Sequence, residues 1–493
     1  MATLNTTSGT LDVDACYPAL LARDARFDGR WFVGVTSTGV YCRPICRVRT
    51  PKRENCRFFG SAAQAEARAF RPCLKCRPEL APKADEARWS AMDASRTLAR
   101  QAAAWLDACD DAEASVEQLA GVIGVSSRHL RRIFAAEHGV TPLQYLQTRR
   151  LLLAKQLLTD SALPIGEVAH AAGFASLRRF NAAFADHYRM QPTALRKEGR
   201  AQPDEGTTLL RLAYREPYDV DGVLTFLQAR AVPGVETVDV ANARVQRTVS
   251  VTHAGKLCSG WLRVDFGRRP GQVWVEPSPS LWPAVGTLLP LLRRWLDLDA
   301  DPQGIALALG EGGMPGQRLP GCTDRFELAV RAVLGQQVTV AAARTLAARF
   351  VERFGAPLAD APAGADRLFP SAARMSGELP ERIAELGIIR RRADSILEIA
   401  RRWRELRYAS GLGSADDAVA ELQGIAGIGP WTAHYMLMRG WSWPDAFPPG
   451  DVALRKALGH SDEVPLSPKA YLAAAERYRP YRSYAVLHLW RTL

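Results

Sequence analysis

The spacing of apolar residues changes along this chain of 493 residues, and that change limits its fold more than any other feature. Residues 85–200 repeat apolar side chains at helical spacing, residues 208–290 alternate like strands, and the chain from about residue 292 onward is helical again. Residues 12–82 form a further segment, rich in arginine, that carries two tight cysteine pairs. Because a chain of this length exceeds what one core can organise, the sequence predicts several domains.

Positive charge is concentrated in the first part of the chain. The net charge is +12, and residues 1–200 contain 29 Lys and Arg against 20 Asp and Glu. Such an excess suits a polyanion such as nucleic acid, although a solvated basic surface would have the same composition. No secretion leader and no long apolar run is visible, so we expect a cytoplasmic, nucleoid-associated protein with reduced thiols and no membrane contact.

The two cysteine pairs predict a metal site. Three residues separate Cys42 from Cys46, two separate Cys73 from Cys76, and 26 residues lie between the pairs. Four thiolates at these spacings can close on one tetrahedral Zn(II), which would supply folding energy that so small a segment lacks. Four ordinary thiols are the alternative interpretation.

The sequence around these cysteines resembles the N-terminal domain of the adaptive-response (Ada) regulator family. The matching stretches are 38–46, Thr-Gly-Val-Tyr-Cys-Arg-Pro-Ile-Cys, and 70–78, Phe-Arg-Pro-Cys-Leu-Lys-Cys-Arg-Pro, with Arg-Glu-Asn at 53–55 between them. The resemblance covers roughly residues 14–80. It implies that Cys42 takes a methyl group from a methylphosphotriester in DNA, and we expect the adjacent Arg43 to contact DNA. A purely structural zinc site is the competing role.

The expected methyl transfer would also change the charge of the site. A zinc-bound thiolate stays deprotonated and nucleophilic at neutral pH. Four thiolates on Zn(II) carry a net charge of about −2, and methylation of one sulfur leaves about −1. Repulsion of DNA phosphate should then fall, so that DNA affinity rises.

Residues 115–134 have the layout of a helix-turn-helix, with an apolar first helix, a turn at Gly124 and a cap at Ser126 or Ser127. A second copy follows at residues 164–184. With Thr-Pro at 141–142 and Gln-Pro-Thr at 191–193, these stretches resemble the AraC-type paired helix-turn-helix domain; a helical hairpin bundle is the alternative. The arginines expected to contact DNA are Arg128, Arg131, Arg132, Arg178 and Arg179.

In the Ada family this arrangement implies transcription activation at damage-response promoters, with RNA polymerase as a partner. The family's other methyltransferase domain carries Pro-Cys-His-Arg, and that sequence does not occur in this chain. Repair of O6-methylguanine is therefore not predicted.

A third motif lies near the C-terminus. Residues 422–433, Leu-Gln-Gly-Ile-Ala-Gly-Ile-Gly-Pro-Trp-Thr-Ala, form a helix-hairpin-helix motif whose glycines, Gly427 and Gly429, let backbone N–H groups approach a phosphate. Phe-Pro-Pro-Gly-Asp follows at 447–451. Together these stretches resemble the HhH-GPD DNA glycosylase superfamily, which implies that Asp451 is the catalytic carboxylate. A solvated or helix-capping aspartate is the alternative.

The resemblance narrows to the 3-methyladenine DNA glycosylase II (AlkA) family over about residues 208–493, through stretches such as Pro-Tyr-Asp at 217–219, Arg-Gly-Trp at 439–441 and 482–490. Two residues depart from that family: Val452 replaces a tyrosine, and Gln337 aligns with a leucine that wedges into the base stack. The resemblance implies an aromatic base pocket, although each aromatic residue could instead belong to the core. Expected pocket residues are Phe226, Trp431, Tyr435 and Trp490, and expected DNA contacts are Gly427, Gly429, Thr432 and Gln337.

The subtype follows from what the motifs lack. Bifunctional relatives place a lysine in the hairpin motif for Schiff-base chemistry, where this chain has Trp431. No cysteine follows Cys322, so no iron–sulfur cluster is expected. We expect a monofunctional enzyme that flips the nucleotide out of the stack, stacks its cationic base on aromatic rings and stabilises the sugar cation with Asp451.

These patterns predict a multidomain chain. Its parts are a small α/β zinc domain at 12–82, an all-α paired helix-turn-helix domain at 85–198, a linker at 199–207, an α+β (TBP-like) region at 208–290 and a helical HhH-GPD glycosylase domain at 291–493.

The functional hypothesis is a fusion of damage sensor, transcription regulator and base-excision glycosylase acting on double-stranded DNA, with no demand for a dimer. One alternative is a regulator whose glycosylase-like half only binds DNA. Another is a glycosylase whose first half merely raises DNA affinity.

Overall fold

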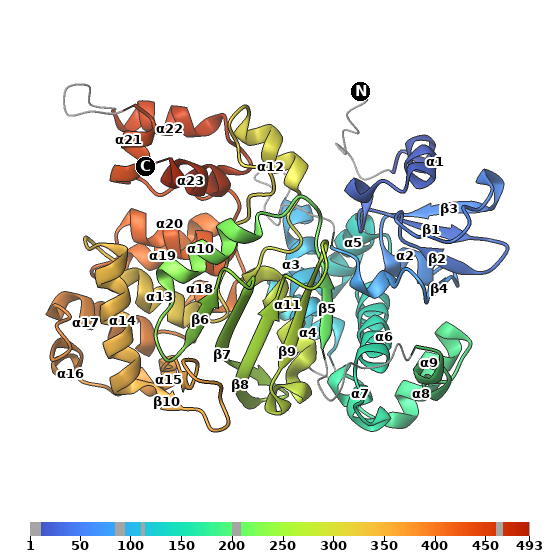
Figure 1. Ribbon diagram of the computed structural model, residues 1–493, viewed down its shortest axis with the longest axis horizontal. Coiled ribbons are helices and arrows are strands. Elements are labelled where there is room, and N and C mark those ends of the chain that lie inside the picture. Colours follow the sequence, from blue (N-terminus) through green and yellow to red (C-terminus); the bar gives the residue numbers. More distant parts are fainter. Residues whose placement is uncertain (1–10, 84–93, 110–113, 200–208, 460–466, 493) are drawn as a thin grey trace.

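Four regions follow one another in the computed structural model, which describes residues 11–83, 94–109, 114–199, 209–459 and 467–492. Figure 1 shows them in chain order from blue to red. The linker expected at 199–207 lies, apart from Gly199, outside the described residues. No helix in the described ranges is long and apolar enough to cross a membrane.

The first region is a small mixed sheet with short helices. Its strands lie in the order β3-β1-β2-β4, and β2 pairs with β4 in parallel, so that Tyr41 lies opposite Pro72. Trp31, Phe32 and Val33 are buried around the sheet. The elements are α1 (Val13–Ala22), β1 (Phe32–Val35), β2 (Val40–Cys42), β3 (Cys56–Phe59), α2 (Ala62–Glu66) and β4 (Arg71–Pro72), with 3₁₀ turns at Ala25–Phe27, Arg53–Asn55 and Pro78–Leu80.

The second region is all helical and internally duplicated, as expected. In each copy a serine caps the second helix, Ser126 in the first and Ser176 in the second, because its hydroxyl accepts a backbone N–H three residues on. A helix that begins at a proline follows each pair. The elements are α3 (Ala94–Ala108), α4 (Val116–Ile123), α5 (Ser127–His138), α6 (Pro142–Asp160), α7 (Ile165–Ala171), α8 (Leu177–Tyr188) and α9 (Pro192–Gly199).

The third region is an antiparallel five-stranded sheet in the order β5-β9-β8-β7-β6. The strand-like alternation predicted within 208–290 includes β6 and β7, which pair along Glu236–Asp239. One face of the sheet packs on helices, and alternate residues of β9 are buried. The elements are β5 (Leu210–Ala213), α10 (Val220–Arg230), β6 (Glu236–Asp239), β7 (Arg244–His253), β8 (Lys256–Asp265), β9 (Gln272–Pro277), a 3₁₀ turn at Pro279–Ala284 and α11 (Val285–Trp295).

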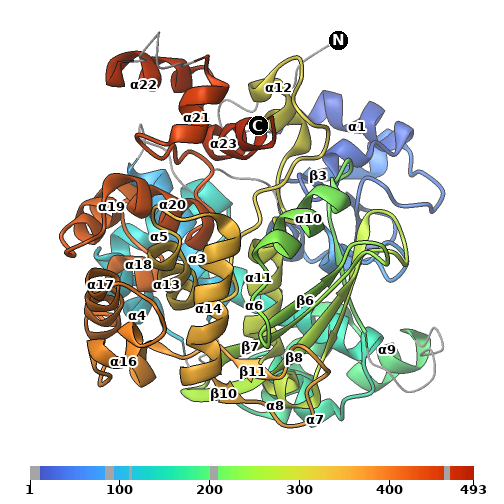
Figure 2. The ribbon, with the colours of Figure 1, turned by 60° about the vertical axis from the view of Figure 1, so that its left-hand side comes forward.

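The fourth region is helical except for one short hairpin that the sequence pattern did not predict. β10 (Ala356–Pro357) pairs with β11 (Arg367–Leu368) just after α14, where Pro357 prevents the helix from continuing. Figures 1 and 2 both place α12 and α21–α23 together at one end of the molecule. The helices are α12 (Pro302–Leu309), α13 (Arg325–Leu334), α14 (Val340–Phe354), α15 (Ala372–Met375), α16 (Pro380–Ala384), α17 (Arg390–Arg401), α18 (Arg407–Ser410), α19 (Ala415–Gln423), α20 (Pro430–Gly440), α21 (Val452–Ala457), α22 (Pro468–Glu476) and α23 (Arg482–Arg491).

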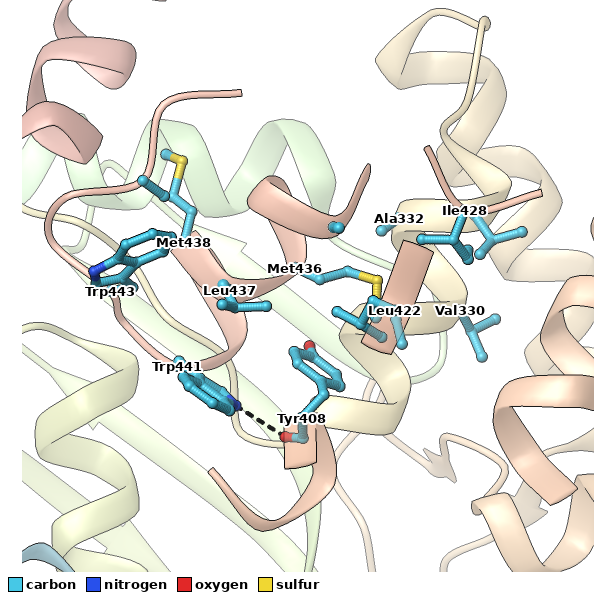
Figure 3. Close-up of a cluster of buried hydrophobic side chains, with 14 of the residues drawn as sticks. Val330, Ala332, Tyr408, Leu422, Ile428, Met436, Leu437, Met438, Trp441 and Trp443 are labelled. Carbon is cyan, nitrogen blue, oxygen red and sulfur yellow. Dashed lines mark hydrogen bonds between the residues drawn. The ribbon is translucent and has the colours of Figure 1, made fainter. Parts of the chain in front are cut away.

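The core of the fourth region forms around α20. Figure 3 shows Met436, Leu437 and Met438 from this helix among buried side chains of α13, α18 and α19. The Trp441 indole N–H donates to the Tyr408 carbonyl oxygen at 2.9 Å, which satisfies the polar atom of a buried aromatic ring. This packing fixes α20, and with it the hairpin that precedes it.

The apolar clusters do not stop at the boundary expected near residue 199. One cluster combines side chains of α6–α9 with those of the five-stranded sheet and α11, for example Leu157 and Phe184 with Leu262 and Leu288. The second helix-turn-helix copy therefore shares its core with the third region, whereas the first copy packs in a cluster of its own.

A buried charge network joins the first three regions. Arg77 donates to Glu79 at 2.8 Å and to both carboxylate oxygens of Asp160 at 2.6 and 3.0 Å. Lys155 on α6 pairs with Glu79 at 2.5 Å, and Arg211 on β5 pairs with Asp160 at 2.5 Å. Because buried charges are costly unless paired, separating these regions would leave several of them uncompensated.

A second junction centres on Arg215, which is 2% exposed. Its guanidinium donates to the carbonyl oxygens of Asp28 at 3.1 Å, Asp299 at 2.7 Å, Ala300 at 3.4 Å and Lys83. The Lys83 N–H donates in turn to the Asp299 carboxylate at 2.7 Å. One arginine of the third region thus joins the turn at Asp28 and the C-terminal end of the first region to the Asp299 loop.

Candidate functional site

The parallel pairing of β2 and β4 brings the two cysteine pairs together. Cys42 ends β2, Cys73 follows β4, and the Cys73 N–H donates to the Tyr41 carbonyl at 2.9 Å. The four sulfurs of Cys42, Cys46, Cys73 and Cys76 lie within 4.8 Å of one another. The Arg43 N–H donates to the Cys76 sulfur at 3.3 Å, which favours a thiolate there. Four converging thiols suit tetrahedral Zn(II), as the spacing predicted.

Arg43 corrects one sequence expectation. Its side chain is 5% exposed, and its guanidinium pairs with the buried Asp28, with Nε donating at 2.8 Å. A second donor of Arg43 reaches the Cys76 carbonyl at 3.1 Å. This arginine therefore braces the cysteine loops and does not face DNA. Asp28 lies 15 residues earlier, and nothing in the local sequence pattern points to that pairing.

The recognition helices carry the arginines that the sequence singled out. Arg128, Arg131 and Arg132 on α5, and Arg178 and Arg179 on α8, are all exposed. Opposite them on the same helices, Leu130, Phe134, Phe180 and Phe184 are buried, so each helix presents a cationic face outward. Arg131 pairs with Glu117 at 3.0 Å on the surface, a contact that water and phosphate can replace.

The fourth region contains a cavity of about 1090 Å³ that lies against α10, α13, α14 and α20. It collects most of the residues predicted for the C-terminal half: Gln337, Gly427, Gly429, Trp431, Thr432, Tyr435, Asp451 and Trp490. These residues are far apart in sequence, and the packing of the helices brings them to the lining of one cavity.

Asp451 lies at the N-terminus of α21 and is 7% exposed. One carboxylate oxygen accepts the Leu454 N–H at 2.8 Å, which makes Asp451 the cap of the helix. The other accepts the Trp431 indole N–H at 2.6 Å, and the Trp490 indole N–H donates to the capping oxygen at 3.3 Å. The capping role offered as an alternative is present, and the same carboxylate also lines the cavity.

Two of the predicted aromatic residues form a stack on α20. Trp431 and Tyr435 lie one helical turn apart, with ring centroids 5.2 Å apart and planes 10° apart. Trp490 on α23 completes the group, 6.3 Å from Tyr435. A planar, electron-poor ring can stack on such a wall.

Phe226 does not belong to this wall. Its ring lines an adjoining cavity of about 210 Å³, which shares Arg230 and Trp490 with the larger one. Arg230 lies over the Phe226 ring at 3.8 Å and Arg439 at 4.6 Å, so two guanidinium groups contact the ring. Phe226 therefore lies beside the aromatic wall and contacts these arginines, and its expected role in base binding stays a prediction.

The arginines themselves were missed by the sequence analysis. Arg439 is 5% exposed, lines the large cavity and donates to the Tyr435 hydroxyl at 3.1 Å. Burial acts to raise the pKa of Tyr435, but the surrounding guanidinium groups, Arg439 first among them, outweigh it and lower that pKa. A charged residue on the buried face of an apolar helix was the available signal.

The hairpin before α20 contains the two glycines that were expected to let a phosphate approach the backbone, and their surroundings differ. Gly427 has φ +92°, and a Cβ there would lie 2.3 Å from the Ser395 hydroxyl, so only glycine fits. At Gly429 no atom lies within 4 Å of the added Cβ. The space in front of Gly429 is open to an incoming backbone, and α20 begins there without a side-chain cap.

The two other residues expected to contact DNA differ in exposure, since Thr432 is buried and Gln337 is exposed. Thr432 is 4% exposed, and its hydroxyl accepts a hydrogen bond from the Gln336 amide at 3.0 Å. Its side chain was expected to contact DNA, but in the structure it is buried. Gln337 is exposed at the tip of the loop before α14, with φ +53°. Val452, the other departure noted above, is 67% exposed beside Asp451.

Four family models match the chain in succession. Residues 15–79 match the metal binding domain of Ada, 119–198 a helix-turn-helix domain, 209–324 the AlkA N-terminal domain, and 330–476 the HhH-GPD superfamily of base excision DNA repair proteins. The order is the one predicted from the motifs.

Curated relatives match both the whole chain and its halves. A probable bifunctional transcriptional activator/DNA repair enzyme AlkA of Mycobacterium tuberculosis is 38% identical over 510 residues, covering 98% of this chain and 97% of that protein. DNA-3-methyladenine glycosylase 2 of Escherichia coli is 36% identical over 57% of this chain and 96% of its own length. The bifunctional transcriptional activator/DNA repair enzyme Ada of Escherichia coli is 36% identical over 28% of this chain and 36% of its own length.

Proposed function

The chain belongs to the family of bifunctional transcriptional activators and DNA repair enzymes that join an Ada-type regulator with a four-cysteine zinc site to an AlkA-type DNA glycosylase, and from that membership we propose a specific activity for each half. For the C-terminal half we propose hydrolysis of the N-glycosidic bond of 3-methyladenine and related alkylated bases. The observation that carries this proposal is the Asp451 carboxylate, held by two indole N–H groups beside a stacked aromatic wall.

The reaction uses these groups in order. The target nucleotide leaves the duplex stack and its cationic base lies against Trp431 and Tyr435. The bond between C1′ and the base nitrogen breaks, the base keeps the electron pair, and Asp451 stabilises the positive charge that develops on the sugar. Water then adds to C1′ and releases a proton, which leaves an abasic site.

The proposal includes a monofunctional mechanism. A lyase step needs an amine that can form a Schiff base, and none of the described residues that line the cavity is a lysine. Trp431 takes the corresponding position in the hairpin motif, and its N–H is already used by Asp451.

The decisive experiment is base release from methylated duplex DNA by wild type and Asp451→Asn. We expect wild type to free methylpurines and to leave abasic sites uncut. The variant should be at least about 100-fold slower at unchanged DNA affinity, the scale of losing a transition-state charge partner. Asparagine is nearly isosteric and still caps a helix, so it isolates the charge. DNA binding without base release by wild type would overturn the glycosylase assignment and leave a regulator that only binds DNA.

For the N-terminal half we propose methyl transfer to Cys42. The methyl carbon forms a bond to the Cys42 sulfur as its bond to the phosphotriester oxygen breaks, and the phosphodiester leaves as an anion. Zinc, when bound by the four cysteines, keeps the sulfur deprotonated. The loss of one negative charge then lowers repulsion of DNA, and the exposed arginines of α5 and α8 hold promoter DNA for RNA polymerase. We propose that the chain acts as a monomer.

Peptide mapping tests the methyl acceptor. After incubation of the full chain with DNA that carries methylphosphotriesters, one methyl group should appear on the Cys42 peptide, and metal analysis should find about one zinc per chain. Cys42 is 4% exposed and Cys76 is more open. A label on Cys76 in place of Cys42 would therefore contradict the assignment of the nucleophile.

A further inference from the structure

Four exposed apolar side chains gather at the mouth of the large cavity. Val338, Val340, Ile389 and Val452 all line it, and their exposed fractions are 37%, 45%, 58% and 67%. They come from three separate places in the chain: the loop before α14 with its first turn, the residue before α17, and the first residue of α21. Single exposed apolar residues need no explanation, but a group that rims one cavity indicates a partner.

The charge around this rim identifies the partner. Arg344 and Arg391 are exposed and line the same cavity, and neither guanidinium has an ion pair or hydrogen bond to any residue that the structure describes. A rim of apolar side chains between unpaired cations matches duplex DNA, which offers stacked bases inside and phosphates outside. This inference rests on the glycosylase activity proposed above.

The loop that carries Val338 is held in place by its neighbour Gln336. The Gln336 amide donates to the Gly427 carbonyl at 2.9 Å and to the Thr432 hydroxyl at 3.0 Å, which ties the loop to the hairpin. The Gln336 carbonyl accepts from the buried Arg392. The tip of the loop after Gln336 is therefore already fixed relative to the hairpin in the free protein. Binding of DNA then costs little conformational entropy at this loop.

A flipped nucleotide leaves a gap in the stack, and unstacking costs a few kcal/mol. An apolar side chain that enters the gap recovers part of this cost, as wedge residues of DNA-bending proteins do. Gln337, at the position that aligns with a wedge leucine, is a polar amide that prefers water to the space between bases. Val338 is the next residue in the chain, and Ile389 directly precedes α17, whose Arg392 binds the Gln336 carbonyl; both side chains are exposed and line the same cavity.

We propose that Val338 and Ile389 fill the stack from which the target nucleotide is flipped, and that Gln336 is the positioning residue that aims Val338. Gln337 then stays at the wet edge of the gap. Two branched side chains from different elements take the part of one long side chain, and both must reach the DNA for flipping to be stable.

The test compares a paired lesion with one that needs no flipping. Excision is measured on a methylated base inside a full duplex and on the same base in an unpaired loop. We expect Val338→Ala and Ile389→Ala each to slow excision from the duplex by about 10-fold, the worth of one buried branched side chain, and to leave excision from the loop close to wild type. A fluorescent base analogue beside the lesion should show a matching loss of flipped population.

Controls separate this proposal from its alternatives. Leu379→Ala removes an equally exposed apolar side chain, 59% exposed, outside the cavity and should change neither substrate. Gln337→Ala should cost less than either apolar variant on the duplex. A larger loss for Gln337→Ala, or equal losses on duplex and loop for Val338→Ala and Ile389→Ala, would overturn the proposal. No base release from either substrate by wild type would instead overturn the glycosylase assignment.

Discussion

Glu66 shows how a single buried carboxyl affects the stability of the first region. It lies on α2, is 7% exposed and accepts the Tyr41 hydroxyl at 3.0 Å, while its other oxygen has no partner among the described residues. Burial raises the pKa of Glu66 to about 8. The folded protein therefore holds a proton there at neutral pH that the unfolded chain has released.

This shift has a definite sign. Between the ordinary pKa of 4.5 and the folded value of about 8, the folded state binds more protons than the unfolded state, so the free energy of unfolding falls as pH rises. Above about pH 8 the effect is constant. Glu66→Gln keeps the shape and removes the proton exchange. We expect the variant to gain stability over wild type from about pH 5 to about pH 8, measured as urea midpoints. Parallel curves for the two proteins would contradict this.

Single residues also mark how far sequence patterns reach. The four cysteines come together as their spacing predicted, because each pair is local and reflects one turn or one strand pair. Asp451 lies in the cavity beside the hairpin motif, and its catalytic role stays a prediction. Arg43 was expected to contact DNA and is instead buried, because its partner Asp28 is set by tertiary packing. The contact of Phe226 with Arg439 was missed for the same reason. A buried ion pair and an aromatic ring covered by arginines depend on tertiary packing, which the spacing of residues in the sequence does not reveal.

At the scale of the element, α21 depends on the residue proposed for catalysis. One oxygen of the Asp451 carboxylate caps this six-residue helix and also accepts from Trp490, while the other accepts the Trp431 indole N–H. Capping and chemistry can be separated, because asparagine caps about as well as aspartate and alanine does not.

We therefore expect Asp451→Ala to be less stable than Asp451→Asn by about 1 kcal/mol, and both to be equally poor in base release. Thermal or urea unfolding of the two variants measures the difference. Ser467→Ala, which removes the cap of the neighbouring α22, is a matched control for stability and should leave base release unchanged. Equal stability of the two Asp451 variants would show that the cap contributes nothing.

The helices of the paired helix-turn-helix and of the hairpin motif were predictable from caps, glycines and apolar spacing. The hairpin of β10 and β11 was not, since two strands of two residues each have no period to detect. The same limit applies to the loop of Gln336, where the contacts to Gly427 and Thr432 depend on how two distant helices meet.

At the scale of the molecule, the regulator and glycosylase halves are docked through buried polar contacts. Arg215 binds the carbonyl oxygens of Asp28 and Lys83 in the first region, and Arg211 enters the network of Arg77 and Asp160. The order of the regions could be predicted from the sequence, but this docking could not, because each arginine is unremarkable in its own segment.

We expect wild type to unfold in fewer calorimetric transitions than Arg215→Met, in which the first region should melt separately and earlier. Methionine keeps the apolar stem and removes the donors. Arg263→Met, which breaks a half-exposed pair with Glu276 on the same sheet, should leave the melting profile unchanged. An unchanged profile for Arg215→Met would show that the Arg215 junction is not needed to hold the first region in place.

The docked arrangement also decides how this molecule can be bivalent. When two binding modules are joined by a loose tether, the second contact is a search whose success depends on tether length and on the effective concentration it creates. Here the recognition helices and the base cavity are held at one separation, so tether length has no influence. Avidity then depends on geometry. A duplex whose curvature matches that separation can contact the helices and the cavity at the same time, and any other duplex can contact only one of them.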